Sequence, residues 1–142
     1  MKVSRTEFVD AYDVRLCVRH WGDESAPKLF MIHGWMDISA SFQFVVDAFK
    51  RDWHVIAPDM RGFGHSGWAK GGYWFPDYLA DLEALLDHYS PNEPVRLIGH
   101  SLGGNITSVY SGIRPSRVAQ LVSLEGYGIV ENRPDMAPGR LE

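Results

Sequence analysis

A serine between two glycines is the residue pattern best suited to covalent chemistry in this chain. The pentapeptide Gly99-His100-Ser101-Leu102-Gly103 follows a short apolar run and precedes a helical pattern. A serine in a tight strand-to-helix turn is held in a strained backbone conformation that points its hydroxyl outward. A side chain at Gly99 or Gly103 would collide with the neighbouring helix or strand. The spacing therefore predicts that Ser101 is a nucleophile.

The flanking sequence favours this interpretation over an incidental serine in a glycine-rich turn. Residues 95–98 form a β-rich apolar run. Apolar residues recur over 106–113 at the spacing of one face of an α-helix. The turn would place the first amides of that helix beside the serine oxygen, where a developing oxyanion needs donors.

Composition limits the class of protein. The 142 residues, of which 45% are hydrophobic and 23% charged, predict one globular domain. The net charge of -4, without a Lys/Arg cluster, predicts neither nucleic acid nor an anionic membrane as partner. Cys17 is the only cysteine, which indicates a reducing compartment. No signal segment and no apolar run of ~20 residues is present, so we predict a cytoplasmic protein.

Strand and helix patterns alternate along the chain. Two β-rich stretches around residues 11–13 predict an antiparallel hairpin. Continuous apolar runs at 28–32, 53–57, 95–98 and 118–124 are typical of buried strands. Helical stripes lie between them at 42–49, 79–89 and 106–113, the first with Ser39 or Ser41 as its expected cap. The pattern predicts an α/β fold, a mostly parallel sheet with an antiparallel N-terminal hairpin and flanking helices.

Three motifs in this order resemble the α/β-hydrolase fold superfamily, and its serine hydrolase and esterase branch most. His33-Gly34-Trp35 is similar to the oxyanion-loop motif, Asp59 to Ser66 to the Asp-x-Arg-Gly-x-Gly-x-Ser loop, and residues 99–103 to the nucleophile elbow. The resemblance runs from Val14 to about Gly128. It implies that residues 1–128 are the N-terminal part of a hydrolase core that lacks the cap and the last strands. Residues 129–142 are then a loop or tail where a cap region would begin.

The resemblance also implies roles for individual residues. Ser101 would attack the acyl carbon of a small-molecule substrate while the amides of Trp35 and Leu102 hold the oxyanion. Five residues would support the motifs: His33, Gly34, Gly99, His100 and Gly103. Serine at the elbow favours acyl chemistry over the epoxide hydrolase and haloalkane dehalogenase branches, which have an aspartate there. No cofactor is implied, and no Cys/His spacing predicts a metal site.

The acid and the histidine base that would complete the catalytic site are harder to find in this sequence. In the family an acid and then a histidine follow the elbow. None of the six histidines stands at the family's position, so we expect the base to be absent from this chain. Glu125, at the end of the last predicted strand, is the positional candidate for the acid, with a carboxylate that orders the turn as the alternative. Arg61 and Asp59 are expected to form an ion pair that ties their loop.

Two functions remain open. The first is a serine hydrolase acting on a small ester or related acyl compound, with an apolar pocket suggested by Trp35, Met36, Phe63, Trp68, Trp74 and Phe75. The second is a non-catalytic truncated or split fragment. In either case the strand at 118–124 would present an unpaired edge and an uncovered apolar face. We therefore expect a homo-oligomer or pairing with a complementary C-terminal half.

Overall fold

The computed structural model describes residues 1–126, so the expected tail over 129–142 lies outside the described residues. The strands are β1 (Ser4–Ala11), β2 (Val14–Trp21), β3 (Lys28–Ile32), β4 (His54–Pro58), β5 (Val95–His100) and β6 (Val118–Leu124). The helices are α1 (Gln43–Ala48), α2 (Phe75–Tyr89) and α3 (Leu102–Ile113), with short 3-10 helices η1 (Ser39–Phe42) and η2 (Pro115–Arg117).

The six strands form one sheet in the order β1-β2-β4-β3-β5-β6. Strands β1 and β2 are an antiparallel hairpin, and β2 joins β4 antiparallel. The pairs β3 with β4, β3 with β5, and β5 with β6 are parallel. The predicted fold class and the N-terminal hairpin are confirmed, and the parallel strands bring the loops after β3, β4, β5 and β6 to one edge of the sheet.

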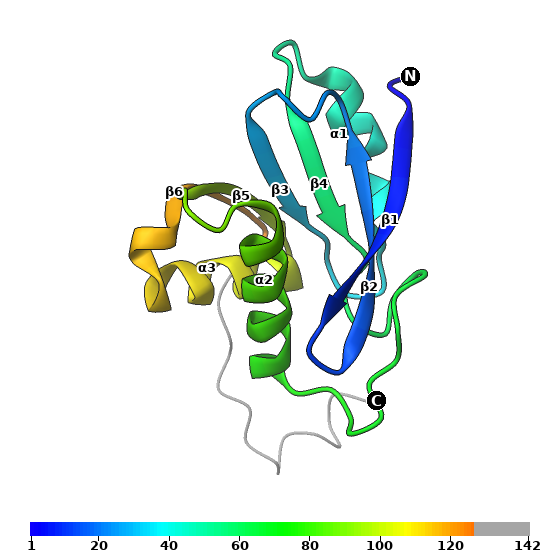
Figure 1. Cartoon of the computed structure of the whole chain (residues 1–142), viewed down its shortest axis with the longest axis vertical. Coiled ribbons are helices and arrows are strands. Elements are labelled where there is room, and N and C mark those ends of the chain that lie inside the picture. The colour runs from blue at the N-terminus through cyan, green and yellow to red at the C-terminus, as the bar shows by residue number, and fades with distance from the viewer. Residues whose placement is uncertain (127–142) are drawn as a thin grey trace.

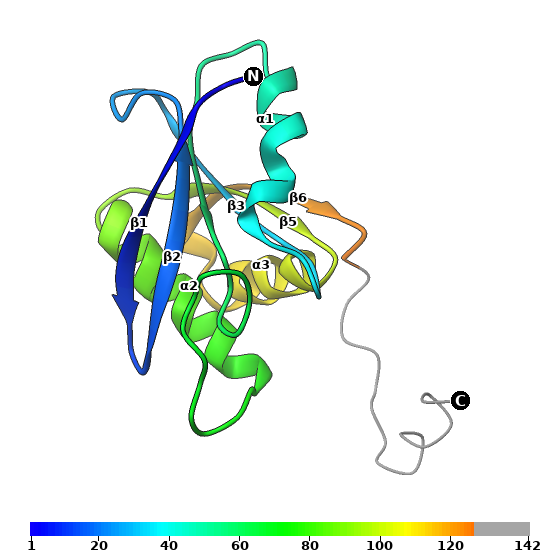
Figure 2. The same cartoon turned by 90° about the vertical axis from the view of Figure 1, so that its right-hand side faces the viewer.

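Helices cover both faces of the sheet, which explains why the central strands are continuously apolar. Phe30 and Ile32 of β3 belong to the core beneath α2 and α3. Leu29 and Met31 belong to a second core that includes Phe42 and Val46 of the η1–α1 segment. Helices α2 and α3 lie together, and α1 lies apart from them across the sheet (Figure 1, Figure 2).

The start of the η1–α1 segment differs from the prediction. Neither Ser39 nor Ser41 caps a helix through its side chain. The Ser39 hydroxyl instead donates to Asp59 Oδ1 at 2.6 Å, and the Ser41 hydroxyl donates to Asp37. The capping prediction was therefore wrong. Both hydroxyls donate to carboxylates, and a hydrogen bond to an ionised acceptor is stronger than one between two neutral groups.

Strand β6 is at the edge of the described sheet and is poorly covered. Val122 is 47% exposed and Leu124 42% exposed. Val122 pairs with Ile98 in register, and Ile98 packs on the α1 side of the sheet, so Val122 and Leu124 face that side. Within residues 1–126, α1 and η1 are the only helices on this face, and the expected exposed edge and face are confirmed there.

No helix within the described range is long and apolar enough to cross a membrane.

A buried polar network lies between β1, β2, β4 and the end of α2. His20 Nδ1 lies 3.0 Å from His54 Nε2, and both side chains are buried. His20 Nε2 lies 3.0 Å from a Glu7 carboxylate oxygen that also accepts the Tyr89 hydroxyl at 2.6 Å. The proton arrangement that satisfies these contacts has His54 Nε2–H donating to His20 and His20 Nε2–H donating to Glu7. His54 Nδ1 then carries a lone pair and has no hydrogen-bond partner within the described residues.

This network predicts acid sensitivity. Burial lowers the pKa of His20 to about 4 and lowers the pKa of His54. Because these folded-state values lie below the unfolded value of about 6.5, the unfolded state binds more protons as the pH falls. The free energy of unfolding is therefore highest above pH 6.5, where both histidines are neutral in either state. It falls as the pH drops from 6.5 toward 4, by about 3 kcal/mol for His20.

Urea unfolding measured between pH 7.5 and pH 5 checks this expectation. The His20→Leu variant should be less stable at pH 7.5 but should show a shallower fall with pH than the parent. His65→Leu is the control, because His65 is an exposed histidine whose replacement should keep the parent slope. Equal slopes for the two variants would contradict the assignment.

Candidate active site

Ser101 stands in a strained turn between β5 and α3. Its backbone angles are φ 50° and ψ -114°, a conformation that non-glycine residues rarely adopt. A Cβ on Gly99 would lie 2.3 Å from the carbonyl oxygen of Gly103, and one on Gly103 would lie 2.2 Å from that of Ile32. The expectation that neither position tolerates a side chain is confirmed.

Two hydrogen bonds fix the elbow to its surroundings. The Ser101 amide donates to the carbonyl oxygen of Leu124 at 2.8 Å, which ties the elbow to the end of β6. The hydroxyl of buried Thr107 donates to the carbonyl oxygen of Gly103 at 2.8 Å. The turn is therefore held from both the strand side and the helix side.

The loop after β3 lies directly against the elbow. A Cβ on Gly34 would be 3.1 Å from Ser101 Cβ and 3.0 Å from His100 Nδ1. Absence of a side chain at Gly34 therefore lets the backbone before Trp35 approach the serine. Leu102 is the first residue of α3, so its amide has no acceptor in the preceding turn of the helix.

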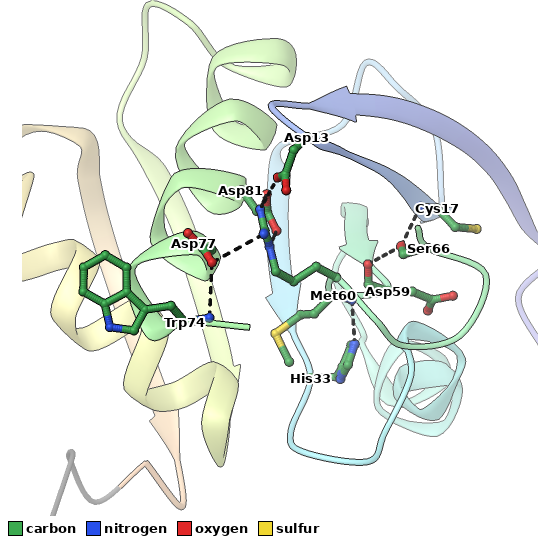
Figure 3. A network of polar contacts seen from close by, with 10 residues as sticks. Asp13, Cys17, His33, Asp59, Met60, Ser66, Trp74, Asp77 and Asp81 are labelled. Carbon is green, nitrogen blue, oxygen red and sulfur yellow. Dashed lines mark hydrogen bonds and ion pairs between the residues drawn. The ribbon is translucent and has the colours of Figure 1, made fainter. Parts of the chain in front are cut away.

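His33 fixes this loop from beneath. Its ring is fully buried, with Nδ1 2.8 Å from the carbonyl oxygen of Gly34 and Nε2 accepting the amide of Met60 at 2.9 Å. Burial lowers the pKa of His33, so the ring is neutral and Nδ1 carries the proton that it donates to Gly34. Figure 3 shows the His33 ring directed at Met60. His33 therefore supports the loop and has no free nitrogen for proton transfer.

Asp59 joins the loop after β4 to the segment that follows the Gly34 loop. Its Oδ1 accepts the amide of Ser39 at 2.8 Å, and its Oδ2 accepts the amide of His65 at 3.0 Å. The Ser66 hydroxyl donates to the Asp59 carbonyl oxygen at 2.5 Å and accepts the amide of Cys17 at 2.8 Å (Figure 3). The Asp-x-Arg-Gly-x-Gly-x-Ser loop is thus a structural brace.

The expected ion pair between Arg61 and Asp59 was wrong. Arg61 instead donates to both carboxylate oxygens of buried Asp81 in α2, at 2.6 and 2.7 Å. Asp13 at 3.2 Å and Asp77 at 3.6 Å lie around the same guanidinium group (Figure 3). Burial raises the pKa of Asp81, and the hydrogen bond to Asp81 raises the pKa of Arg61. Two aspartates four residues apart on a helix were the signal that could have indicated this partner.

Glu125 follows the residue to which the Ser101 amide is bonded. It has φ 58°, a left-handed conformation, and is exposed. The bond from Ser101 to the carbonyl of Leu124 places the Glu125 backbone next to the elbow. The structure thus brings the candidate acid to the same edge of the sheet as the candidate nucleophile.

All six histidines fall within the described residues. His33 is engaged in its loop, His20 and His54 in the buried network, and His88 packs edge-on against Tyr89 at 4.6 Å. His65 is exposed in the loop after β4, and His100 is the last residue of β5, directly before Ser101. Within residues 1–126 no histidine nitrogen is hydrogen-bonded to Ser101 Oγ. No cluster of three or more His, Cys, Asp or Glu side chains in this range is arranged to hold a metal ion.

Comparison with known proteins identifies the family. The family model for the alpha/beta hydrolase fold matches residues 27–141. The chain belongs to the alpha/beta hydrolase fold family. A serine hydrolase-like protein from Danio rerio is 33% identical over 112 residues, which are 78% of this chain and 34% of that protein. The 3-hydroxybutyrate-oligomer hydrolase of Cupriavidus necator is 31% identical over 131 residues, 90% of this chain and 42% of that enzyme.

Solved structures agree with this assignment. An alpha/beta hydrolase from Novosphingobium aromaticivorans is 34% identical, with a TM-score of 0.74 over 85% of this chain and 44% of that one. A thioesterase domain from the curacin biosynthetic pathway is 23% identical, with a TM-score of 0.83 over 98% of this chain and 50% of that one, which shows the fold alone. The chain thus spans between a third and a half of the length of these proteins.

The elbow geometry predicts opposite effects for two glycines of the same helix. Gly103→Ala should lower the free energy of unfolding by about 3 kcal/mol or more, because its Cβ would meet the backbone of β3. Gly112→Ala should raise the free energy of unfolding by up to about 1 kcal/mol, because Gly112 is exposed with no atom within 4 Å of an added Cβ. Urea denaturation of both variants measures the two effects, and equal destabilisation would refute the close approach at Gly103.

Proposed function

We propose that Ser101 is the nucleophile of a serine hydrolase that acts on a small ester or related acyl compound. The observation that carries this proposal is the strained backbone of Ser101 at the start of α3, with the Gly34 backbone packed against its Cβ. A serine held in this way presents its hydroxyl to a substrate at the sheet edge. The names of the relatives, serine hydrolase-like protein and hydrolase, support the same class.

The amides of Leu102 and Trp35 are the proposed oxyanion donors. Leu102 begins α3, where the helix dipole adds partial positive charge. Trp35 follows Gly34, the residue that packs against Ser101. Backbone donors of this kind are fixed before reaction, and each typically contributes about 3 kcal/mol to the transition state.

The general acid–base partner is proposed to come from outside this chain. Neutral His33 has both ring nitrogens engaged, and His20 and His54 are paired within their own network. Without a base the serine hydroxyl keeps its ordinary low reactivity, and oxyanion donors alone give at most about 10³-fold to 10⁴-fold catalysis over water. Glu125 remains the proposed acid, with a turn-ordering carboxylate as the alternative.

The second candidate function is a non-catalytic fragment that assembles with another chain. The exposed Val122 and Leu124 on an edge strand favour it, since such an edge is a template for further pairing. We propose a second copy of this chain or a complementary C-terminal half as the partner. Cys17 is buried, and burial raises its pKa, which fits a thiol kept inert in the proposed cytoplasmic location.

Reaction with an activated ester tests the nucleophile. The chain should hydrolyse nitrophenyl acetate slowly at best, and the acetyl group should be found on Ser101 by peptide mass spectrometry. Ser101→Ala should remove both the labelled peptide and the residual turnover, while Ser116→Ala, at an exposed serine in η2, should change neither.

Two results would contradict this account. Rapid turnover that survives Ser101→Ala would remove Ser101 from the reaction. Rapid turnover that one histidine substitution abolishes would show that the base lies within this chain, and His65 and His100 are the first to test.

Light scattering during size-exclusion chromatography at micromolar concentration tests the assembly. The chain alone should self-associate, because association covers the apolar side chains of β6. Val122→Lys should shift it toward monomer, while Ser116→Lys, at an exposed residue of η2 outside the strand, should not. A parent chain that is monomeric, unfolds sharply and binds no hydrophobic dye would exclude the assembly proposal.

A further inference from the structure

An aromatic pocket lies beside the loop that packs against Ser101. It has a volume of about 260 Å³ and is lined by Trp35, Gly62, Phe63, Trp68, Tyr73 and Tyr78. Five of these six residues are aromatic and none is charged. They come from the loop after β3, the long loop between β4 and α2, and α2 itself. Of the residues expected to form an apolar pocket, Trp35, Phe63 and Trp68 line this one, whereas Met36, Trp74 and Phe75 do not.

Close packing determines the shape of this pocket. Gly62 has φ +80°, and a Cβ there would lie 2.5 Å from the ring of Tyr73. The Tyr73 ring therefore packs directly against the backbone of Gly62. Phe63 stands edge-on to Trp35, with ring centroids 5.4 Å apart, and edge-on to His33 at 5.5 Å. The histidine that holds the Gly34 loop therefore also holds one wall of the pocket.

Trp35 links the pocket to the proposed reaction site, because it lines the pocket and follows Gly34 in the chain. Gly34 packs on Ser101 Cβ, and Trp35 is the next residue along the chain. A substrate carbonyl oxygen bound by the Trp35 amide would carry its substituent past the Trp35 side chain. That side chain is 62% exposed and is one wall of the pocket.

We propose that this pocket binds an aryl ring carried by the ester substrate, so that the site selects small aryl-bearing esters. This inference rests on the proposed function of Ser101. An uncharged wall gives no partner to an ionic substituent, and burying an unpaired charge there would be costly. Aromatic side chains at different orientations offer a ring both edge-to-face and stacked contacts. A cluster of exposed aromatic side chains, among them Trp68 at 79% exposure, is typical of a binding surface.

Binding of phenylacetamide to the full chain tests the proposal without requiring catalysis. Two-dimensional ¹⁵N NMR resolves the indole signals of the five tryptophans. The signals of Trp35 and Trp68 should move, and that of buried Trp21 should not. The backbone amide signals of Trp35 and Leu102 should move with them, because the amide group of the ligand imitates the acyl group. Hexanamide, which has an alkyl chain instead of the ring, should bind about tenfold more weakly.

Two exposed tryptophans of the same loop make a matched pair of variants. Trp68→Ala should raise the Kd of phenylacetamide about tenfold, and Trp74→Ala, at a 70% exposed residue outside the pocket, should leave it unchanged. Both side chains are solvent-exposed, so neither substitution should unfold the chain.

The outcomes separate this inference from the function on which it rests. Ring-selective binding at Trp35 and Trp68 supports the pocket even if Ser101 is never acylated, and in that case only the hydrolase proposal fails. Equal affinity for phenylacetamide and hexanamide, or equal effects of Trp68→Ala and Trp74→Ala, overturns the pocket proposal even if Ser101 is acylated. Movement of the pocket signals without those of the Trp35 and Leu102 amides overturns its link to the reaction site.

Discussion

The close approach of helix α3 to strands β3 and β5 is the constraint on which the rest of the structure depends. Only glycine at positions 99 and 103 allows the helix backbone to lie this near the carbonyl oxygen of Ile32. With the helix in this position, the turn at Ser101 has a positive φ, and the Ser101 amide bonds to the carbonyl of Leu124 at the end of β6. The same packing therefore fixes the serine, the start of α3 and the last described strand.

Buried polar side chains hold the loops at the sheet edge in place by hydrogen bonds to their backbone. His33 and Asp59 bond to backbone amides of neighbouring loops, and Ser66 bonds to both β2 and the Asp59 carbonyl. Each such bond gives only about 1 kcal/mol of net stability, but leaving a buried partner unsatisfied costs about 1–3 kcal/mol. The loops consequently have few alternative conformations, which is the property that a site with fixed backbone donors requires.

Local patterns in the sequence predicted the individual strands, the hairpin and the elbow, because each is formed by residues that lie close together in the sequence. The partner of Arg61 was missed because Asp81 and Asp13 are 20 and 48 residues away, and only the fold brings them together. The pairing of His20 with His54 was missed for the same reason, since β2 and β4 are not consecutive strands. The aromatic pocket was partly indicated by tryptophans near the motifs, but Gly62 and Tyr73 become its floor only through tertiary packing. The catalytic roles of the motif residues stay predictions.

The two faces of the sheet differ in how completely helices cover them. The face under α2 and α3 holds the larger core, and the supports of the elbow lie there: Thr107, Gly103 and the end of β3. The α1 face is open over Val122 and Leu124. The elbow is therefore held by contacts on the α2 and α3 face. A partner that covered the α1 face would not need to change the conformation of the elbow. Within residues 1–126 no histidine is hydrogen-bonded to Ser101, and a complementary half that covers the α1 face is therefore also the proposed source of the base.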